Sequence, residues 1–205
     1  MTEVLQRSFV AELLFLFQTA IMFQKGVGAT LKVEIITASN QAALRVKNEP
    51  FPLVGKLDVV RLQNQWAYNI MFCPAAQVRW QTFPQEKYQL DEVVAQGFAL
   101  GAFDGQKPVG LGIFVKQRSR FLYLADLKIN GSYRGKGLGK QILTSSLLLA
   151  QKLGYGGIYT IAQDNNLNAC LFYLNFGFEI GGLNTRTYDH SAQAGKSDVY
   201  FYFEF

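Results

Sequence analysis

The hydrophobic pattern of the chain changes its period across one glycine-rich loop, and this change restricts the fold more than any other feature. The stretch Phe121 to Ile129 has the composition of a strand, whereas Gly137 to Leu153 places Leu138, Ile142 and Leu149 on one face of a helix. A strand that passes through a short loop into a helix requires a fold with both a sheet and helices. The sequence therefore predicts a domain of the α/β class.

Turn signals divide the rest of the chain into further strands and helices. The Asp104-Gly105 turn between two apolar runs is the clearest hairpin signal. Hairpins come first and helix–strand units follow, so we expect a mixed α/β (α+β) domain. The other expected strands are Leu31–Thr37, Leu57–Leu62, Trp66–Phe72, Phe98–Phe103, Val109–Lys116, Gly157–Ala162, Phe178–Leu183 and Lys196–Phe205, and the other expected helices are Gln85–Gln96 and Leu167–Asn175.

Composition excludes several classes of protein. Of the 205 residues, 49% are hydrophobic and 17% charged, which excludes a globally disordered chain. Two cysteines and one histidine, His190, supply neither a disulfide framework nor a Cys/His zinc site, so no metal is expected. The same scarcity disfavours Ser-His or Cys-His catalysis. The net charge of +5 favours an anionic partner, and a phosphorylated small molecule explains it better than nucleic acid because the cationic residues are spread along the chain.

Residues 1–31 stand apart from the rest, which we assign to one domain of residues 32–205. Phe9 to Phe23 is mostly apolar, but Glu12 interrupts it and it is shorter than the roughly 20 residues that span a bilayer. A signal peptide is disfavoured because no clear cleavage site follows. We expect an amphipathic helix, or an extension upstream of a working start at Met22, and a cytoplasmic protein without a membrane span.

The glycine-rich loop has the chemistry of an anion site. Its glycines let the backbone approach a ligand closely, and the first N–H groups of the following helix point toward that ligand. Such a helix start attracts a phosphate, and three cationic side chains add to the attraction. The P-loop pattern fails because Gln141 follows where Ser or Thr is required, and the dinucleotide fingerprint fails because Lys140 takes the place of its third glycine. The residues of this glycine loop are Arg134, Gly135, Lys136, Gly137, Leu138, Gly139 and Lys140.

A second motif follows about 30 residues later. Asn166, Ala169 and Tyr173 are spaced so that they lie on one face of a helix, where a small residue would admit a ligand flanked by the other two. Tyr173 by itself is equally consistent with a core aromatic residue. Together with the pattern Arg-x-x-Gly-x-Gly at Arg134, Gly137 and Gly139, this motif resembles the GNAT N-acetyltransferases, which bind acetyl-coenzyme A.

The similarity is densest to the streptothricin (nourseothricin) acetyltransferases, which are antibiotic-resistance enzymes. It covers roughly residues 32–205 and is carried by Gln163–Leu167, Ala169–Tyr173, Gly177–Gly181 and the aromatic tail Val199–Phe205. The resemblance implies the GNAT fold, a mixed central sheet of about six or seven strands flanked by helices. It also implies direct attack of a primary amine on acetyl-CoA. It further implies that Tyr173 is the general acid, that the backbone of Leu127 and Ile129 pairs with the pantetheine arm, and that the glycine loop, Asn166 and Ala169 bind the cofactor.

Three departures from the family pattern concern the acceptor. Ala125, Ile161 and Asn184 stand where those enzymes carry carboxylates that a polycationic drug would need. Asp126 remains as the candidate general base, because it is a carboxylate within an otherwise apolar strand. The alternative for Asp126 is a structural ion pair with Lys128. Both cysteines are expected to be core thiols rather than nucleophiles.

The sequence therefore predicts an acetyl-CoA-dependent N-acetyltransferase that acts on a small primary amine, with streptothricin-type antibiotics as the leading acceptor. A protein or peptide N-acetyltransferase and a non-catalytic acyl-CoA sensor are the alternatives, and a nucleic-acid binder is disfavoured. The protein is expected to be a monomer or a homodimer.

Overall fold

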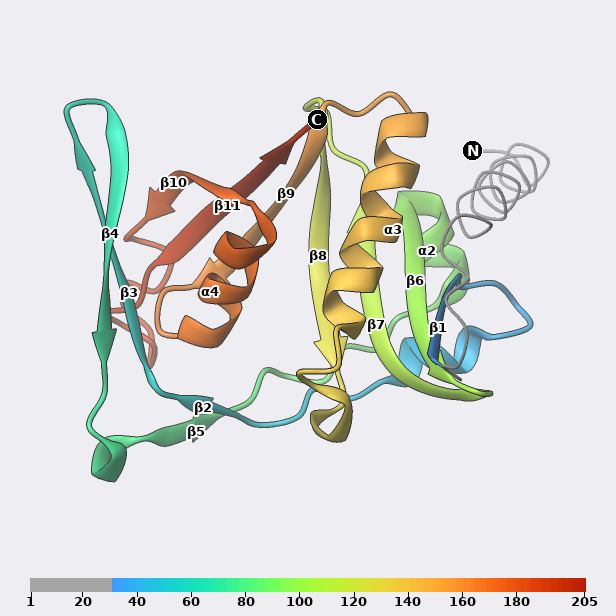
Figure 1. The fold of residues 1–205 in the computed structure, drawn as a ribbon, viewed down its shortest axis with the longest axis horizontal. Coiled ribbons are helices and arrows are strands. Elements are labelled where there is room, and N and C mark those ends of the chain that lie inside the picture. The colour runs from blue at the N-terminus through green and yellow to red at the C-terminus, as the bar shows by residue number, and fades with distance from the viewer. Residues whose placement is uncertain (1–30) are drawn as a thin grey trace. The chain divides into compact units, whose positions relative to one another are not determined.

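The computed structural model describes residues 31–205, which form two compact units (Figure 1). The first unit contains residues 31–49 and 84–158 together with Phe205, and the second contains residues 50–83 and 159–204. The chain thus enters the second unit twice. The expectations for residues 1–30, a helix or a start at Met22, lie outside the described residues.

The first unit is a four-stranded antiparallel sheet with helical segments on both faces. Its strands are β1 (Leu31–Ile35), β6 (Gly97–Asp104), β7 (Lys107–Val115) and β8 (Phe121–Ile129), and they pair in this order. Its helical segments are the 3-10 helices η1 (Gln41–Arg45) and η3 (Gly131–Tyr133) and the α-helices α2 (Leu90–Gln96) and α3 (Leu138–Lys152).

Alternation along β7 explains why helices cover both faces of this sheet. Leu111 and Ile113 belong to an apolar cluster with Ala43 and Leu44 of η1 and with Val93 of α2. The intervening position, Gly112, faces α3, and a Cβ there would lie 2.8 Å from the methyl group of Ile142. The close approach of α3 to the sheet therefore requires a glycine at this position.

The second unit contains three strands, a helix, one separate hairpin and one further pair of strands. The strands β9 (Gly157–Gln163), β10 (Glu179–Asn184) and β11 (Asp198–Glu204) accompany α4 (Leu167–Phe176). The strands β3 (Gly55–Leu62) and β4 (Gln65–Phe72) form a separate antiparallel hairpin, and β2 (Phe51–Leu53) pairs with β5 (Arg79–Gln81). The short 3-10 helix η2 (Ala75–Gln77) lies between β4 and β5.

Seven strands are hydrogen-bonded in the order β1-β6-β7-β8-β9-β11-β10, and the chain passes from the first unit to the second within β9. The predicted α/β class, with a sheet of six or seven strands and accompanying helices, is confirmed. Every strand predicted from the sequence is present, and its ends lie within about two residues of the predicted positions.

One predicted helix is substantially shorter than expected. The helix predicted over Gln85–Gln96 begins only at Leu90, because residues 85–89 have no regular secondary structure and the first of them bond to a distant residue. Gln85 exchanges hydrogen bonds of 2.8 and 2.9 Å with the backbone of Asn48, and the Asn48 side chain donates to Glu86. No described helix is long and apolar enough to cross a membrane.

Candidate active site

The glycine loop connects the end of β8 to the start of α3 through two residues with left-handed backbone angles. Gly135 has φ +74° and Gly137, the N-cap of α3, has φ +82°. A Cβ at either position would meet no atom within 4 Å, so the space above the loop is open. Glycine is required here by the backbone angle, and its lack of a side chain leaves the loop backbone accessible.

The start of α3 presents backbone donors to this open space. The first intrahelical bond runs from the Gln141 N–H to the Gly137 carbonyl at 3.0 Å, so the N–H groups of Leu138, Gly139 and Lys140 precede it. Gly137 has no side chain that could cap them. Lys136 and Lys140 are exposed at the same end of the helix. The uncapped donors and the cations together fit a diphosphate group.

Arg134 points back toward the strand that precedes the loop. Its Nε donates to the Ile129 carbonyl at 3.0 Å, and its guanidinium lies 4.0 Å from the Glu49 carboxylate. The same carboxylate accepts a 2.6 Å bond from the Gly131 N–H. Arg134 thus connects the loop to β8 and to Glu49, which makes it a positioning residue for the loop backbone.

Asp126 lies in a cluster of charged and polar side chains on β8 and on the extended segment before α2. Lys128 is buried, and its Nζ lies 2.9 Å from Asp126 and 2.5 Å from Glu86. The Tyr88 hydroxyl donates to the same Asp126 oxygen at 2.9 Å. Burial raises the pKa of Asp126 above its usual value, and the Lys128 ammonium opposes that rise. The ion pair with Lys128 that the sequence offered as an alternative is present in the structure.

A β-bulge places Ala125 outside the regular ladder of β7 and β8. Ile113 is paired with Asp126 and Phe114 with Leu124, so Ala125 is the extra residue, and it is exposed. Leu127 pairs with Gly112, and Ile129 pairs with Gly110. The Ile129 carbonyl accepts the bond from Arg134 Nε.

The second predicted motif lies on α4 and has structural roles of its own. Asn166 is the N-cap of α4, and its side chain accepts a 3.4 Å bond from the Ala169 N–H. Tyr173 is 7% exposed, and its ring packs against Phe178 and Phe201 at 5.5 and 5.6 Å between centroids. The predicted residues thus fall into two groups, one in each unit: Leu127, Ile129, Asp126 and Arg134–Lys140 in the first, and Asn166, Ala169 and Tyr173 in the second.

The sequence model of the acetyltransferase (GNAT) family matches residues 65–178, which is more than half of the chain. The chain belongs to this family. The matched region contains β8, the glycine loop, α3 and α4. The prediction of a GNAT N-acetyltransferase is therefore confirmed at the level of the family.

Characterised relatives of this GNAT chain include two small-amine acetyltransferases by name. Streptothricin acetyltransferase A of Bacillus subtilis is 28% identical over 85 residues, which are 42% of this chain and 49% of the relative. The L-ornithine N5-acetyltransferase of Arabidopsis thaliana is 36% identical over 92 residues, 45% of this chain and 37% of the relative. The chain therefore matches about half or less of the length of these two relatives.

Solved structures of GNAT proteins show the same fold over a longer range. The putative streptothricin acetyltransferase of Bacillus anthracis, determined in complex with acetyl coenzyme A, has a TM-score of 0.75 to this chain. The similarity covers 85% of this chain and 98% of that one, at 21% sequence identity. This agreement extends the GNAT fold to residues beyond the family match.

The buried thiol of Cys170 in this GNAT domain is not suited to act as a nucleophile. Burial raises the pKa of Cys170 to about 12, so its thiol stays protonated near neutral pH. The expectation that both cysteines are core thiols is correct for Cys170 and wrong for Cys73, which is only half-buried because it follows β4 at the edge of the hairpin. Among residues 31–205, no three His, Cys, Asp or Glu side chains gather in a group that could hold a metal ion.

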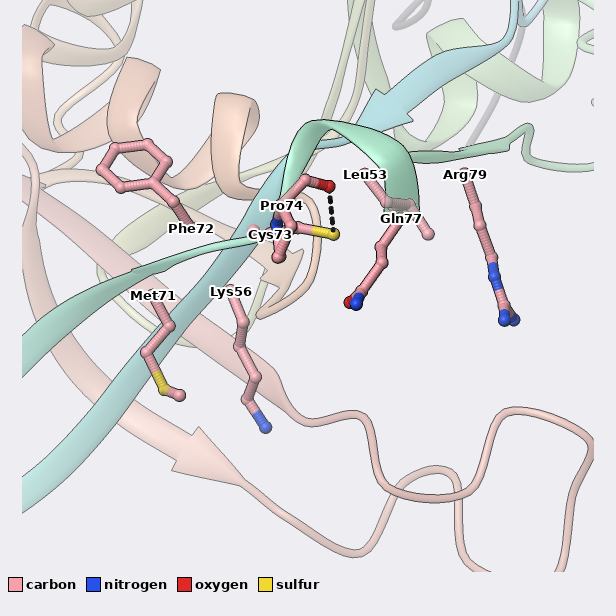
Figure 2. Close-up of a pocket in the computed structure, with 9 residues that line it drawn as sticks. Leu53, Lys56, Met71, Phe72, Cys73, Pro74, Gln77 and Arg79 are labelled. Carbon is pink, nitrogen blue, oxygen red and sulfur yellow. Dashed lines mark hydrogen bonds between the residues drawn. The ribbon is translucent and has the colours of Figure 1, made fainter.

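A shallow pocket of about 360 Å³ opens within the second unit, at the base of the β3–β4 hairpin. Figure 2 shows Lys56, Gln77 and Arg79 extending toward the same side of this pocket. The sequence predicted no site here. Lys56 forms a 3.0 Å ion pair with Asp164, which is 2% exposed and one of whose oxygens has no hydrogen-bond partner among the described residues. The pocket is lined by Leu53, Gly55, Lys56, Met71, Phe72, Cys73, Pro74, Gln77 and Arg79.

Three side chains lie near Asp126 in the structure. The sequence analysis missed two of them and named Lys128 only as an alternative ion-pair partner. The three are Glu86, Tyr88 and Lys128, which approach Asp126 from segments about 40 residues apart. A local sequence signal existed only for Lys128, since it is two positions from Asp126 on one strand and so shares its face. Glu86 and Tyr88 belonged to the region predicted as helix.

Proposed function

We propose that this protein is an N-acetyltransferase that transfers the acetyl group of acetyl-CoA to a primary amine of a small molecule. The observation that carries the proposal is the start of α3, where uncapped N–H groups, two left-handed glycines and exposed lysines face open space. Family membership supports the same reaction. Streptothricin-type antibiotics are the leading class of acceptor.

The residues of the glycine loop would hold the diphosphate of the cofactor. Leu138, Gly139 and Lys140 supply backbone N–H donors, while Lys136 and Lys140 supply positive charge. Arg134 keeps the loop in position through its bond to Ile129. We assign the pantetheine arm to the backbone of Leu127 and Ile129, which would pair with it as an added strand does, and we assign Asn166 and Ala169 to the cofactor as well.

Acetyl-CoA supplies an activated thioester, so the protein must mainly provide an unprotonated amine. A primary amine with a pKa of about 10.4 must lose a proton, which costs about 4.6 kcal/mol at pH 7. We assign Asp126 as the base that accepts this proton, directly or through water. Its raised pKa supports this role, since a base is most effective when its pKa approaches the working pH.

We assign Tyr173 as the acid that protonates the leaving thiolate. A thiol with a pKa of about 8.5 leaves without much assistance, so the contribution of this acid is modest. Neither cysteine is assigned a role, because no acyl-enzyme is needed when the amine attacks directly.

The acceptor is assigned from the relatives and from the charges near Asp126. Two relatives are named for streptothricin and for L-ornithine, both of which carry aliphatic primary amines. Ala125, Ile161 and Asn184 provide no negative charge, and Lys128 neutralises part of the charge of Asp126 and Glu86. We keep streptothricin-type antibiotics as the leading class because of these relatives, and we expect the three missing carboxylates to weaken the binding of so highly charged an acceptor. We further propose that the enzyme acts in the cytoplasm, where acetyl-CoA is formed.

A thiol-release assay with acetyl-CoA tests this proposal. The acceptors are streptothricin, ornithine, a polyamine, an aminoglycoside and a lysine-containing peptide, each at the same concentration. We expect amine-dependent release of thiol with at least one of the small molecules. Release with the peptide alone would favour a peptide N-acetyltransferase, and binding of acetyl-CoA without release would favour an acyl-CoA sensor.

A further inference from the structure

The exposed apolar side chains of the described residues are concentrated on one hairpin. Nine large apolar residues are at least 36% exposed, and six of these belong to β3 and β4. The six are Val60, Leu62, Tyr68, Ile70, Met71 and Phe72, whose exposed fractions range from 36% to 73%. Alternation divides them between the two faces of the hairpin, with Tyr68, Ile70 and Phe72 on one face and the other three on the opposite face.

The geometry of the hairpin places four of the side chains of β4 in one row. Gln63 and Asn64 have φ +47° and +68°, which gives the two-residue turn that matches strand twist. Alternation from this turn puts Trp66, Tyr68, Ile70 and Phe72 on one face. Figure 2 shows this alternation at the base of the hairpin, where Phe72 points away from Met71 and Lys56.

Among residues 31–205, only half of this face is covered. On β3, Leu57 and Val59 share the face with the β4 row and are 0% and 7% exposed, since α4 packs against β3. On β4, Tyr68, Ile70 and Phe72 remain 43%, 41% and 73% exposed. The β4 half therefore lacks the cover that the β3 half receives.

The free edge of β4 adds backbone groups to the same residues. In the part of the chain that the structure describes, β4 pairs with β3 alone in a two-stranded sheet. In this turn type the flanking pair, Leu62 and Gln65, is hydrogen-bonded, so alternate positions along β4 direct their N–H and C=O groups away from β3. These positions are Trp66, Tyr68, Ile70 and Phe72, the residues of the apolar row.

The edge also lacks the features by which proteins block strand pairing. The eight residues of β4 contain no charged side chain and no proline, and the first proline after it is Pro74. Two copies of this strand can thus meet without repulsion between like charges.

We propose that this protein forms a homodimer in which β4 pairs antiparallel with β4 of a second copy, about a twofold axis at Asn69. In this register Trp66 pairs with the partner's Phe72 and Tyr68 pairs with the partner's Ile70. Every outward N–H and C=O of the row then has a partner, and the two hairpins form one four-stranded sheet. The proposal does not depend on the catalytic role proposed above.

The row itself supplies part of the area that such a dimer needs. An aromatic side chain buries about 150–250 Å² when covered. The exposed fractions of Tyr68, Ile70 and Phe72 therefore give on the order of 300 Å² of apolar area per copy. A stable interface buries about 800 Å² on each partner, so the paired backbone and the side chains around it must supply the remainder.

Sedimentation and light scattering of the full chain between about 1 and 100 µM test the proposal. We expect the wild type to be a dimer and Ile70→Lys to be a monomer that keeps the circular-dichroism spectrum of the folded wild type. Leu148→Lys is the matched control, because Leu148 is a 36% exposed apolar residue on α3, and this variant should remain a dimer. A monomeric wild type at 100 µM, or a dimer that Ile70→Lys leaves intact, would overturn the proposal.

Oxidative crosslinking tests the register itself. Two copies of residue 69 would form a non-hydrogen-bonded pair with Cα atoms about 4.5 Å apart, within the range of a disulfide. In a Cys73→Ser background, Asn69→Cys should yield a disulfide-linked dimer. Gln65→Cys on the same strand should not, because this register separates the two copies of residue 65. Equal crosslinking of both variants would contradict the proposed axis.

Discussion

At the scale of single residues, Tyr173 illustrates how a proposed catalytic group can also belong to the core. Its ring packs against Phe178 and Phe201, so replacement by phenylalanine preserves the packing and removes only the hydroxyl. We expect Tyr173→Phe to lower kcat by about 10²-fold, the lower end for a general acid, because a thiolate leaves readily. Affinity for acetyl-CoA should change little. Tyr202→Phe, whose ring stacks on Tyr159, is the matched control. Unchanged turnover in Tyr173→Phe would remove Tyr173 from the mechanism.

The role of Asp126 as a base can be separated from its role in the ion pair by a pH profile. Its pKa is raised by burial, so the ionised base is lost as the pH falls through this raised value. We expect kcat/KM of the wild type to fall on the acidic side above the usual Asp pKa of about 3.9.

Asp126→Asn should abolish that acidic limb and lower kcat by about 10²-fold. Lys128 keeps Glu86 as a partner in this variant, so the fold should be retained. If the ion pair is the only role of Asp126, the variant will change the melting temperature and leave the shape of the pH profile as it is.

At the scale of elements, the start of α3 depends on the left-handed backbone of its N-cap. Gly137→Val adds a β-branched side chain to this anion site, and its backbone angle of φ +82° is strained for valine. We expect binding of acetyl-CoA, measured by calorimetry, to weaken by at least 100-fold.

Gly105→Val is the matched control for this substitution. Gly105 has φ +59° and open space for a Cβ, but it lies in the β6–β7 turn. Both variants carry a similar backbone strain, so only the location of the substitution differs. Equal losses of affinity in the two variants would show that strain, and not the anion site, is responsible.

The elements that the sequence predicted are those whose pattern is local. The hydrophobic periods of β8 and α3 can be recognised from a few neighbouring residues, and so can the Asp104-Gly105 turn. All three elements occur where expected. The prediction that the helix begins at Gln85 was wrong because Gln85 bonds to Asn48, 37 residues away, and residues 85–89 have no regular secondary structure. The ion pair of Asp126 with Lys128 was foreseen because both lie on one strand, whereas the approach of Glu86 and Tyr88 was not predictable, since a tertiary contact leaves no local period.

At the scale of the whole molecule, binding of acetyl-CoA should raise the free energy of unfolding. A ligand that binds only the native state stabilises it by about 2.7 kcal/mol at 100 times its Kd. For a chain of 205 residues, each kcal/mol raises Tm by roughly 2–4 °C, so a shift of about 5–10 °C is expected in a thermal melt.

The source of that stabilisation can be tested with a truncated ligand. Acetyl-pantetheine lacks the diphosphate that we assign to the glycine loop, so it should produce a much smaller shift at the same concentration. Gly137→Val should lose the shift with acetyl-CoA, whereas Gly105→Val should keep it. Added salt should reduce the shift, because Lys136 and Lys140 are exposed and their attraction for phosphate is screened. A shift that is as large with acetyl-pantetheine as with acetyl-CoA would place the binding energy elsewhere and exclude the loop as the diphosphate site.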